Sequence, residues 1–173
     1  SSFLYHSLQQ RLGVYFSQIF SLKQLIISSI FTVSTFSSIA FEFLGGIFSS
    51  RFGFVKITRI GFFLMSIFSF SLVFVNDYKL LYALIALWGI GWALSHVGLS
   101  SRLTHFEDSI MRDASSLNSS LRFAFGGLGA LAGGIFAYDL GSYKLLFFIV
   151  TLFIFMLGVF LNRIINEGEE SYG

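Results

Sequence analysis

The chain has 173 residues, of which 55% are hydrophobic and only 12% charged, with a formal net charge of +2. Soluble domains carry about 25% charged residues, so this composition excludes an ordinary soluble domain and indicates an integral membrane protein. The absence of cysteine excludes disulfides and thiolate metal sites. The basic residues are interpreted as topology signals, because so small a net charge does not indicate a nucleic-acid-binding surface.

Long apolar runs separated by short polar turns predict membrane-spanning helices. A hydrocarbon layer of roughly 30 Å requires about 20 apolar residues per helix, and the runs lack the regular alternation of strands. We therefore expect an all-α integral membrane fold, with one bundle of six transmembrane helices in residues 1–165. The predicted spans are 3–20, 24–48, 57–76, 79–101, 117–138 and 143–163.

The first predicted span is the weakest, because its centre carries Gln9, Gln10 and Arg11. Three explanations fit such a segment: it is a truncated helix, it lines a cavity, or it lies partly at the membrane interface. Arg11 is a candidate coupling or cavity residue. The chain begins without an initiator Met or a signal-peptide pattern. We interpret it as a fragment cut on its N-terminal side.

The second predicted span has a polar stripe, in which Ser34, Ser38 and Glu42 recur at four-residue spacing and so share one face. Glu42 precedes Arg51 by nine residues, or roughly 13 Å of helix, which places it deep in the apolar layer. A carboxylate there is protonated, paired or facing a wet cavity. Glu42 and Ser38 are candidate coupling or cavity residues. The alternative is a Glu that only fastens this helix to its neighbours.

The fourth predicted span places Trp88, Trp92 and His96 on one face. An aromatic wall with few polar groups suits an organic ligand, so Trp92 and His96 are candidate cavity residues. Packing of the two Trp against lipid or other helices is the alternative. The following segment, 102–116, has mixed charge and is expected to be a solvated loop with a short surface helix. Its acids and histidine follow no regular metal-ligand spacing, and no metal site is expected.

The fifth predicted span carries a stripe of small residues after one arginine. The stripe consists of Arg122, Gly126, Gly129 and Gly133, with Gly134 beside it. Small residues at this spacing allow helix backbones to approach closely, so the glycines are expected to form a packing face. Arg122 either extends to the interface or pairs with Glu42. The sixth predicted span is uniformly apolar, and residues 166–173 are expected to form an acidic, disordered cytoplasmic tail.

The basic residues divide between the two ends of the predicted helices. Arg51, Lys56, Arg59, Arg102, Arg112 and Arg163 fall on one side, and Lys23, Lys79 and Lys144 on the other. The positive-inside rule then assigns the first side, including the C-terminus, to the cytoplasm. We expect a multi-pass protein of the plasma membrane.

The turn between the second and third spans reads Gly46-x-x-x-Ser50-Arg51-x-Gly53. It resembles the loop signature of the Major Facilitator Superfamily, G-x-x-x-D-R-x-G-R-R. Gly46, Arg51 and Gly53 match, whereas Ser50 stands in place of the acid, and the two basic residues after the glycine are absent. The fifth span is similar to the fifth or eleventh helix of the same superfamily, in which G-P-x-x-G-G is common, with Ala130 at the proline position.

This resemblance implies one six-helix half of a superfamily transporter, such as a drug or sugar permease. The incomplete signature favours the C-terminal half. The family implies alternating access, a small-molecule substrate, coupling to H⁺ or Na⁺, contact with lipid, and a second six-helix half of the same chain. Gly46, Arg51 and Gly53 would take part in gating on the cytoplasmic side. No cofactor is implied.

A different class of function fits the same helix pattern. A six-helix bundle also serves a non-transporting membrane scaffold, a receptor or a partner subunit, since packing stripes occur in all of these. An enzyme is not expected, because three scattered histidines and one buried acid provide no convergent catalytic set. A preceding six-helix unit with its own basic turn would favour the transporter.

Overall fold

The computed structural model of the chain describes residues 2–103, 108–139 and 143–170, which form α-helices joined by short links. In chain order the helices are α1 (Ser2–Phe20), α2 (Gln24–Phe52), α3 (Phe54–Ser71), α4 (Tyr78–Leu103), α5 (Asp108–Asp139) and α6 (Tyr143–Glu170). No strand occurs within the described ranges, in agreement with the expected all-α fold.

Several helix ends differ from the predicted ranges. The segment 108–116, expected to be mainly loop, is the first part of α5, and His105 and Glu107 lie outside the described residues. The prediction of a disordered tail is wrong for residues 166–170, because α6 continues to Glu170. In contrast, α3 ends at Ser71, although its span was expected to reach 76. Hydropathy marks the apolar part of a helix and not its ends, since charged residues such as Glu, Lys and Arg are good helix formers.

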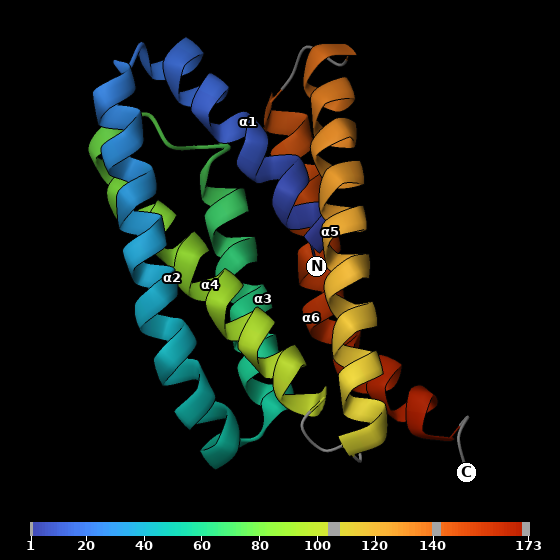
Figure 1. Ribbon diagram of the computed structural model, residues 1–173. Coiled ribbons are helices and arrows are strands. Elements are labelled where there is room, and N and C mark those ends of the chain that lie inside the picture. The colour runs from blue at the N-terminus through green and yellow to red at the C-terminus, as the bar shows by residue number, and fades with distance from the viewer. Residues whose placement is uncertain (1, 104–107, 140–142, 171–173) are drawn as a thin grey trace.

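Successive helices run in opposite directions along the bundle (Figure 1). The α2–α3 junction and the C-terminal end of α6 lie at one end of the molecule, and the α1–α2 and α3–α4 junctions lie at the other. The first end therefore contains Arg51 and Lys56, and the second contains Lys23 and Lys79. This is the division of basic residues that the sequence predicts.

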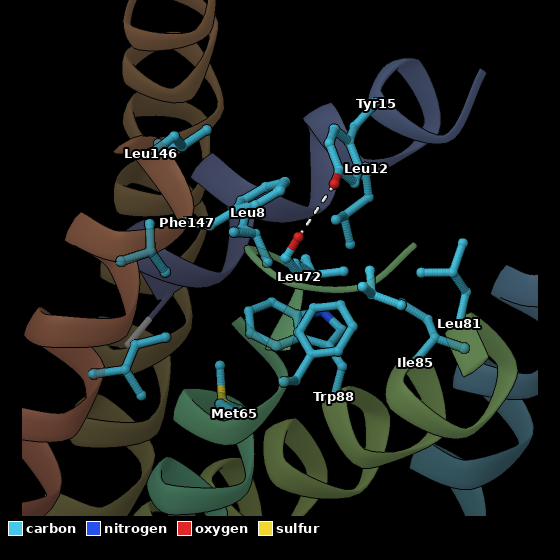
Figure 2. Packing of buried hydrophobic residues seen from close by; sticks show 14 of the residues in the cluster. Leu8, Leu12, Tyr15, Met65, Leu72, Leu81, Ile85, Trp88, Leu146 and Phe147 are labelled. Carbon is cyan, nitrogen blue, oxygen red and sulfur yellow. Dashed lines mark hydrogen bonds between the residues drawn. The ribbon is translucent and has the colours of Figure 1, made fainter. Parts of the chain in front are cut away.

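The main hydrophobic core joins α1, α3, α4 and α6, with a smaller contribution from α2. Figure 2 shows the side chains of α1 lying over those of α3 and α4, beside α6. The Tyr15 hydroxyl of α1 donates a hydrogen bond of 3.2 Å to the carbonyl oxygen of Leu72, at the end of α3. The largest fully buried side chains are Trp88, Phe16, Phe68 and Phe147.

Helix α5 contributes none of the described residues of this core and packs through its small residues instead. Gly129 and Gly133 approach α1 so closely that a Cβ on either would overlap a backbone carbonyl oxygen, that of Phe3 or Ser7. The Ser2 hydroxyl also donates a hydrogen bond of 2.8 Å to the carbonyl oxygen of Arg122. The α1–α5 pair is therefore joined backbone to backbone.

Within the described residues, four segments are long and apolar enough to cross a membrane: Gln24–Phe52, Phe54–Ser71, Tyr78–Ser101 and Tyr143–Leu161. Helices α1 and α5 are not among them, so hydropathy supports four of the six expected spans. Large apolar side chains point outward from the bundle, and Phe43 is 74% exposed. Exposed apolar patches of this kind are costly in water and typical of surfaces that meet a membrane or another protein.

Candidate functional site

Three polar side chains from α2, α4 and α5 meet beside α4, where the His96 side chain is 27% exposed and that of Glu42 is 47% exposed. The Nδ1 atom of His96 lies 3.7 Å from Oε1 of Glu42. The Nε2 atom on the opposite side of the same ring contacts Nη1 of Arg122. The imidazole therefore lies between the carboxylate and the guanidinium, and the expected alternative of a direct Glu42–Arg122 pair does not occur.

The hydrogen-bond chemistry of arginine assigns the protonation state of this imidazole. A guanidinium has five N–H donors and no acceptor, so the Nε2 atom of His96 must accept from Arg122. The proton of the neutral ring is then on Nδ1, which faces the Glu42 carboxylate. This arrangement needs a neutral His96 and an ionised Arg122.

The close packing of α2 on α4 brings Glu42 to His96. Ser38 and Gly45 lie four residues before and three residues after Glu42, so all three share one face of α2. The Ser38 hydroxyl donates a hydrogen bond of 3.1 Å to the carbonyl oxygen of Gly89, and Gly45 contacts side chains of α4. Ser38, a candidate cavity residue, therefore connects the two helices, and it lies outside the two cavities of about 410 and 800 Å³.

His96 and Arg122 line a cavity of about 410 Å³ between α4, α5 and the first turn of α1. Small-molecule sites in proteins have volumes of about 300–1,000 Å³. Arg122 is the one charged side chain among the lining residues, which are Ser2, Phe3, Trp92, His96, Leu99, Ser100, Asn118, Leu121, Arg122 and Phe125.

Stacked aromatic rings form one wall of this cavity. Trp92 lies parallel to the His96 ring, at 4° and 5.9 Å between centroids. The Tyr5 ring of α1 stacks on Trp92 at 3.9 Å and on Trp88 at 5.0 Å. Trp88 is fully buried and donates a hydrogen bond of 2.8 Å from its indole nitrogen to the side-chain oxygen of Gln9. Trp92 thus lines the cavity, whereas Trp88 belongs to the core.

A family model described as Major Facilitator Superfamily matches residues 6–171. The chain belongs to the Major Facilitator Superfamily. This membership confirms the resemblance found in the two sequence motifs and supports a transporter-type protein in general. No curated protein and no solved structure gives a significant match to the chain.

The superfamily signature lies at the α2–α3 junction. Gly53 is the single residue between the two helices, and its φ of 89° lies in a region that favours glycine. Arg51 is in the last turn of α2 and is exposed, with its guanidinium 5.7 Å from the centre of the Phe52 ring. Gly46 has open space around its Cα, so nothing in the packing requires a glycine there. The expected turn is therefore one residue long, and Arg51 lies on a helix.

Arg11 lies away from the cavity of His96 and Arg122. It is half-buried between α1 and α5, where a Cβ at Gly134 would overlap its guanidinium. Gly126 faces the His6 ring in the same interface. Arg11 therefore faces the packing surface of α5. It lines neither the cavity of His96 and Arg122 nor a larger cavity between α1 and α2.

A second cavity, of about 800 Å³, lies between α1 and α2. Its polar lining consists of neutral groups, including Gln10, Gln18, Gln24 and Thr32. It contains no side chain that changes charge with pH and no charged group among the described lining residues. The larger cavity therefore lacks the electrostatic chemistry of the smaller one.

Sequence reasoning missed Asn118 and Phe125, which line the smaller cavity, and Tyr5, which stacks on the Trp92 ring of its wall. Asn118 precedes Arg122 by four residues, so its place on the same face of α5 was detectable from spacing. Tyr5 gave no comparable signal, because its stacking on Trp92 joins residues 87 positions apart. Among the described residues, no group of three or more His, Cys, Asp or Glu could hold a metal ion.

Proposed function

We propose that this chain forms one six-helix half of a secondary transporter, which moves a small organic solute by alternating access. The observation that supports the proposal is the Glu42–His96–Arg122 set, in which His96 and Arg122 line a 410 Å³ cavity and Glu42 faces His96 from a half-exposed position on α2. Charged groups within membrane-spanning helices are costly and commonly mark substrate or ion pathways. The incomplete loop signature favours the C-terminal half.

The weak contact between α4 and α5 supports a moving site. The backbones of α2 and α3 pack extensively on α4, and that of α5 packs extensively on α1, whereas the α4 and α5 backbones approach each other at few points. The Arg122–His96 contact crosses this weakly packed boundary. Alternating access moves one structural unit against another around the binding site, and a weakly packed α4–α5 boundary would let the site adjust during that motion.

Membrane placement and coupling belong to the same proposal. The end of the bundle with Arg51 and Lys56 faces the cytoplasm, together with the C-terminus, because basic residues concentrate there. The protein is placed in the plasma membrane, and H⁺ or Na⁺ drives transport. A second six-helix half of the same protein would complete the cavity.

Alternating access can be tested by cysteine accessibility, because the chain has no cysteine of its own. Ser100→Cys introduces a thiol into the smaller cavity, and Ser28→Cys introduces one into the larger. In the intact protein, labelling by an impermeant maleimide should change in opposite directions at the two sites when a transported solute is added. Uptake of labelled organic acids, sugars and amines into proteoliposomes identifies that solute.

Two results would contradict this function. Solute binding without uptake in any class of compound would favour a receptor or scaffold. Equal accessibility of both cysteines, with and without a solute that is taken up, would argue against alternating access at these cavities.

A further inference from the structure

We propose that the cavity beside Arg122 binds a small organic anion with a flat apolar body, together with one proton taken up by His96. The proposal rests on the transporter function only for its biological setting. It concerns binding, which can be measured without transport, so its failure and the failure of the proposed function are distinguishable.

The charge of Arg122 is incompletely paired. Among the described residues, its guanidinium contacts the neutral His96 ring and lies 5.5 Å from the centre of the Phe123 ring, and no carboxylate forms an ion pair with it. A planar guanidinium binds a carboxylate through two parallel hydrogen bonds, which are stronger than a bond to a neutral acceptor. An anion in the cavity would therefore be a better partner for Arg122 than His96 is.

The cavity wall around Arg122 is mainly aromatic and apolar. Trp92, Phe3, Phe125 and Leu121 supply flat or apolar surfaces around the cation. Asn118, on the same face of α5 as Arg122, adds an amide that can both donate and accept. One cation and one amide among aromatic rings favour an aromatic or similarly flat carboxylate over a polyhydroxylated solute.

Binding of the anion is linked to uptake of a proton. Without ligand, Glu42 and Arg122 carry opposite charges and His96 is neutral, so the set has no net charge. A bound anion adds one negative charge, and a proton on Nε2 of His96 restores neutrality. That protonated ring cannot accept from Arg122, but it can donate to Glu42 on one side and to the anion on the other. Each ligand therefore favours the other, because binding couplings are reciprocal.

Among the groups near His96 on neighbouring helices, one other side chain could take up the proton in place of His96. Glu42 approaches from α2 and Arg122 from α5. From α1, Tyr5 stacks on Trp92 and the His6 ring lies 6.3 Å from it. The α3 residues that lie against the glycines of this part of α4 include Phe54, Thr58, Gly61 and Met65, none of which titrates. His6 is thus the alternative proton acceptor that an experiment has to separate from His96.

The test uses the intact protein in nanodiscs and two probes with the same ring, benzoate and the neutral benzamide. Isothermal titration calorimetry should show benzoate binding roughly ten- to a hundredfold more tightly than benzamide, the loss expected for a missing charge-assisted hydrogen bond. Titrations in two buffers of different ionisation enthalpy should show net uptake of one proton per benzoate, in proportion to the fraction of His96 that is neutral beforehand.

Variants assign the two roles. Arg122→Gln should weaken benzoate binding by roughly ten- to a hundredfold, whereas Arg112→Gln, at an exposed position of the same helix, should leave it unchanged. His96→Gln should bind benzoate without proton uptake, and His6→Gln should keep the uptake. Equal affinity for benzoate and benzamide, or no binding of benzoate, would overturn the anion site without any variant. Proton uptake that persists in His96→Gln would overturn the role of His96.

Discussion

At the scale of single residues, the position of Arg51 separates its effect on stability from its effect on transport. Its side chain is exposed at the end of α2, and the contact described for it is with the ring of the adjacent Phe52. Removal of the guanidinium should therefore change the free energy of unfolding by no more than about 0.5 kcal/mol, the usual range for an exposed surface position. A functional role at this end of the bundle would then appear in kinetics alone.

We expect Arg51→Ala to change the rate of uptake while the melting temperature stays nearly constant. Lys56→Ala is the matched control, because Lys56 is also basic and exposed near the same junction. Initial rates in proteoliposomes and thermal unfolding followed by Trp fluorescence provide the two measurements. Unchanged uptake kinetics in Arg51→Ala would remove the proposed gating role.

Gly53 and Gly46 both belong to the superfamily signature but differ in what their backbones require. Gly53 has a φ of 89°, whereas Gly46 is helical and has no atom close to the position of a Cβ. Gly53→Ala should lower the free energy of unfolding by about 1–3 kcal/mol, and Gly46→Ala should be neutral or slightly stabilising. Thermal unfolding of both variants checks this, and equal melting temperatures would contradict it.

Substitution of Glu42 tests whether its contact with His96 has a role in ion coupling. Glu42→Gln keeps an acceptor that can reach Nδ1 of His96 but removes the negative charge. If coupling passes through this carboxylate, the variant should lose the pH dependence of uptake and remain folded. Uptake that keeps the full pH dependence of the wild type would refute the hypothesis.

At the scale of helices, the bundle uses two kinds of contact. Bulky side chains fill the core between α1, α3, α4 and α6, whereas α5 meets α1 through glycines that allow close backbone approach. In a membrane, helix association depends on such packing, because lipid tails provide no hydrophobic driving force between helices. The α1–α5 contact should therefore be sensitive to small increases in side-chain volume.

We expect Gly129→Val to destabilise the protein by about 1–3 kcal/mol, the usual cost of overpacking. A Cβ at Gly129 would overlap the backbone of Phe3, which cannot move like the end of a flexible side chain. Gly127→Val is the control, since nothing lies within 4 Å of a Cβ there. Unfolding in increasing denaturant compares the two, and similar midpoints would show that the α1–α5 contact is not closely packed in the membrane.

At the scale of the whole molecule, the two ends of the bundle differ in charge, and this difference predicts its orientation. The α2–α3 junction carries Arg51 and Lys56, while the α3–α4 junction carries Lys79. In intact cells, an impermeant maleimide should label Asn76→Cys, at the α3–α4 junction, but not Ser50→Cys, at the α2–α3 junction. Labelling of Ser50→Cys in intact cells, with Asn76→Cys protected, would reverse the orientation. Permeabilised cells provide the control for reactivity.

The sequence by itself determined the all-α fold class, the membrane character and the family. Apolar runs and their lengths are local properties, so they locate helices without knowledge of their neighbours. They do not set helix ends, which is why α5 begins before 117 and α6 continues past 163. Within the described ranges, hydropathy supports four spans, because the polar residues of α1 and α5 are compatible with a helix but reduce its apolar signal.

Only the tertiary structure decided which polar groups meet. Glu42, His96 and Arg122 were each candidates from their sequence context. Their contacts, however, join residues that lie 26 positions apart (His96 and Arg122) and 54 positions apart (Glu42 and His96) in the sequence. Those contacts depend on the rotation and relative height of α2, α4 and α5, which the glycine contacts and the core set. The same geometry placed Ser38 and Arg11 in packing interfaces. Helical spacing assigns residues to a face, whereas packing decides what that face meets.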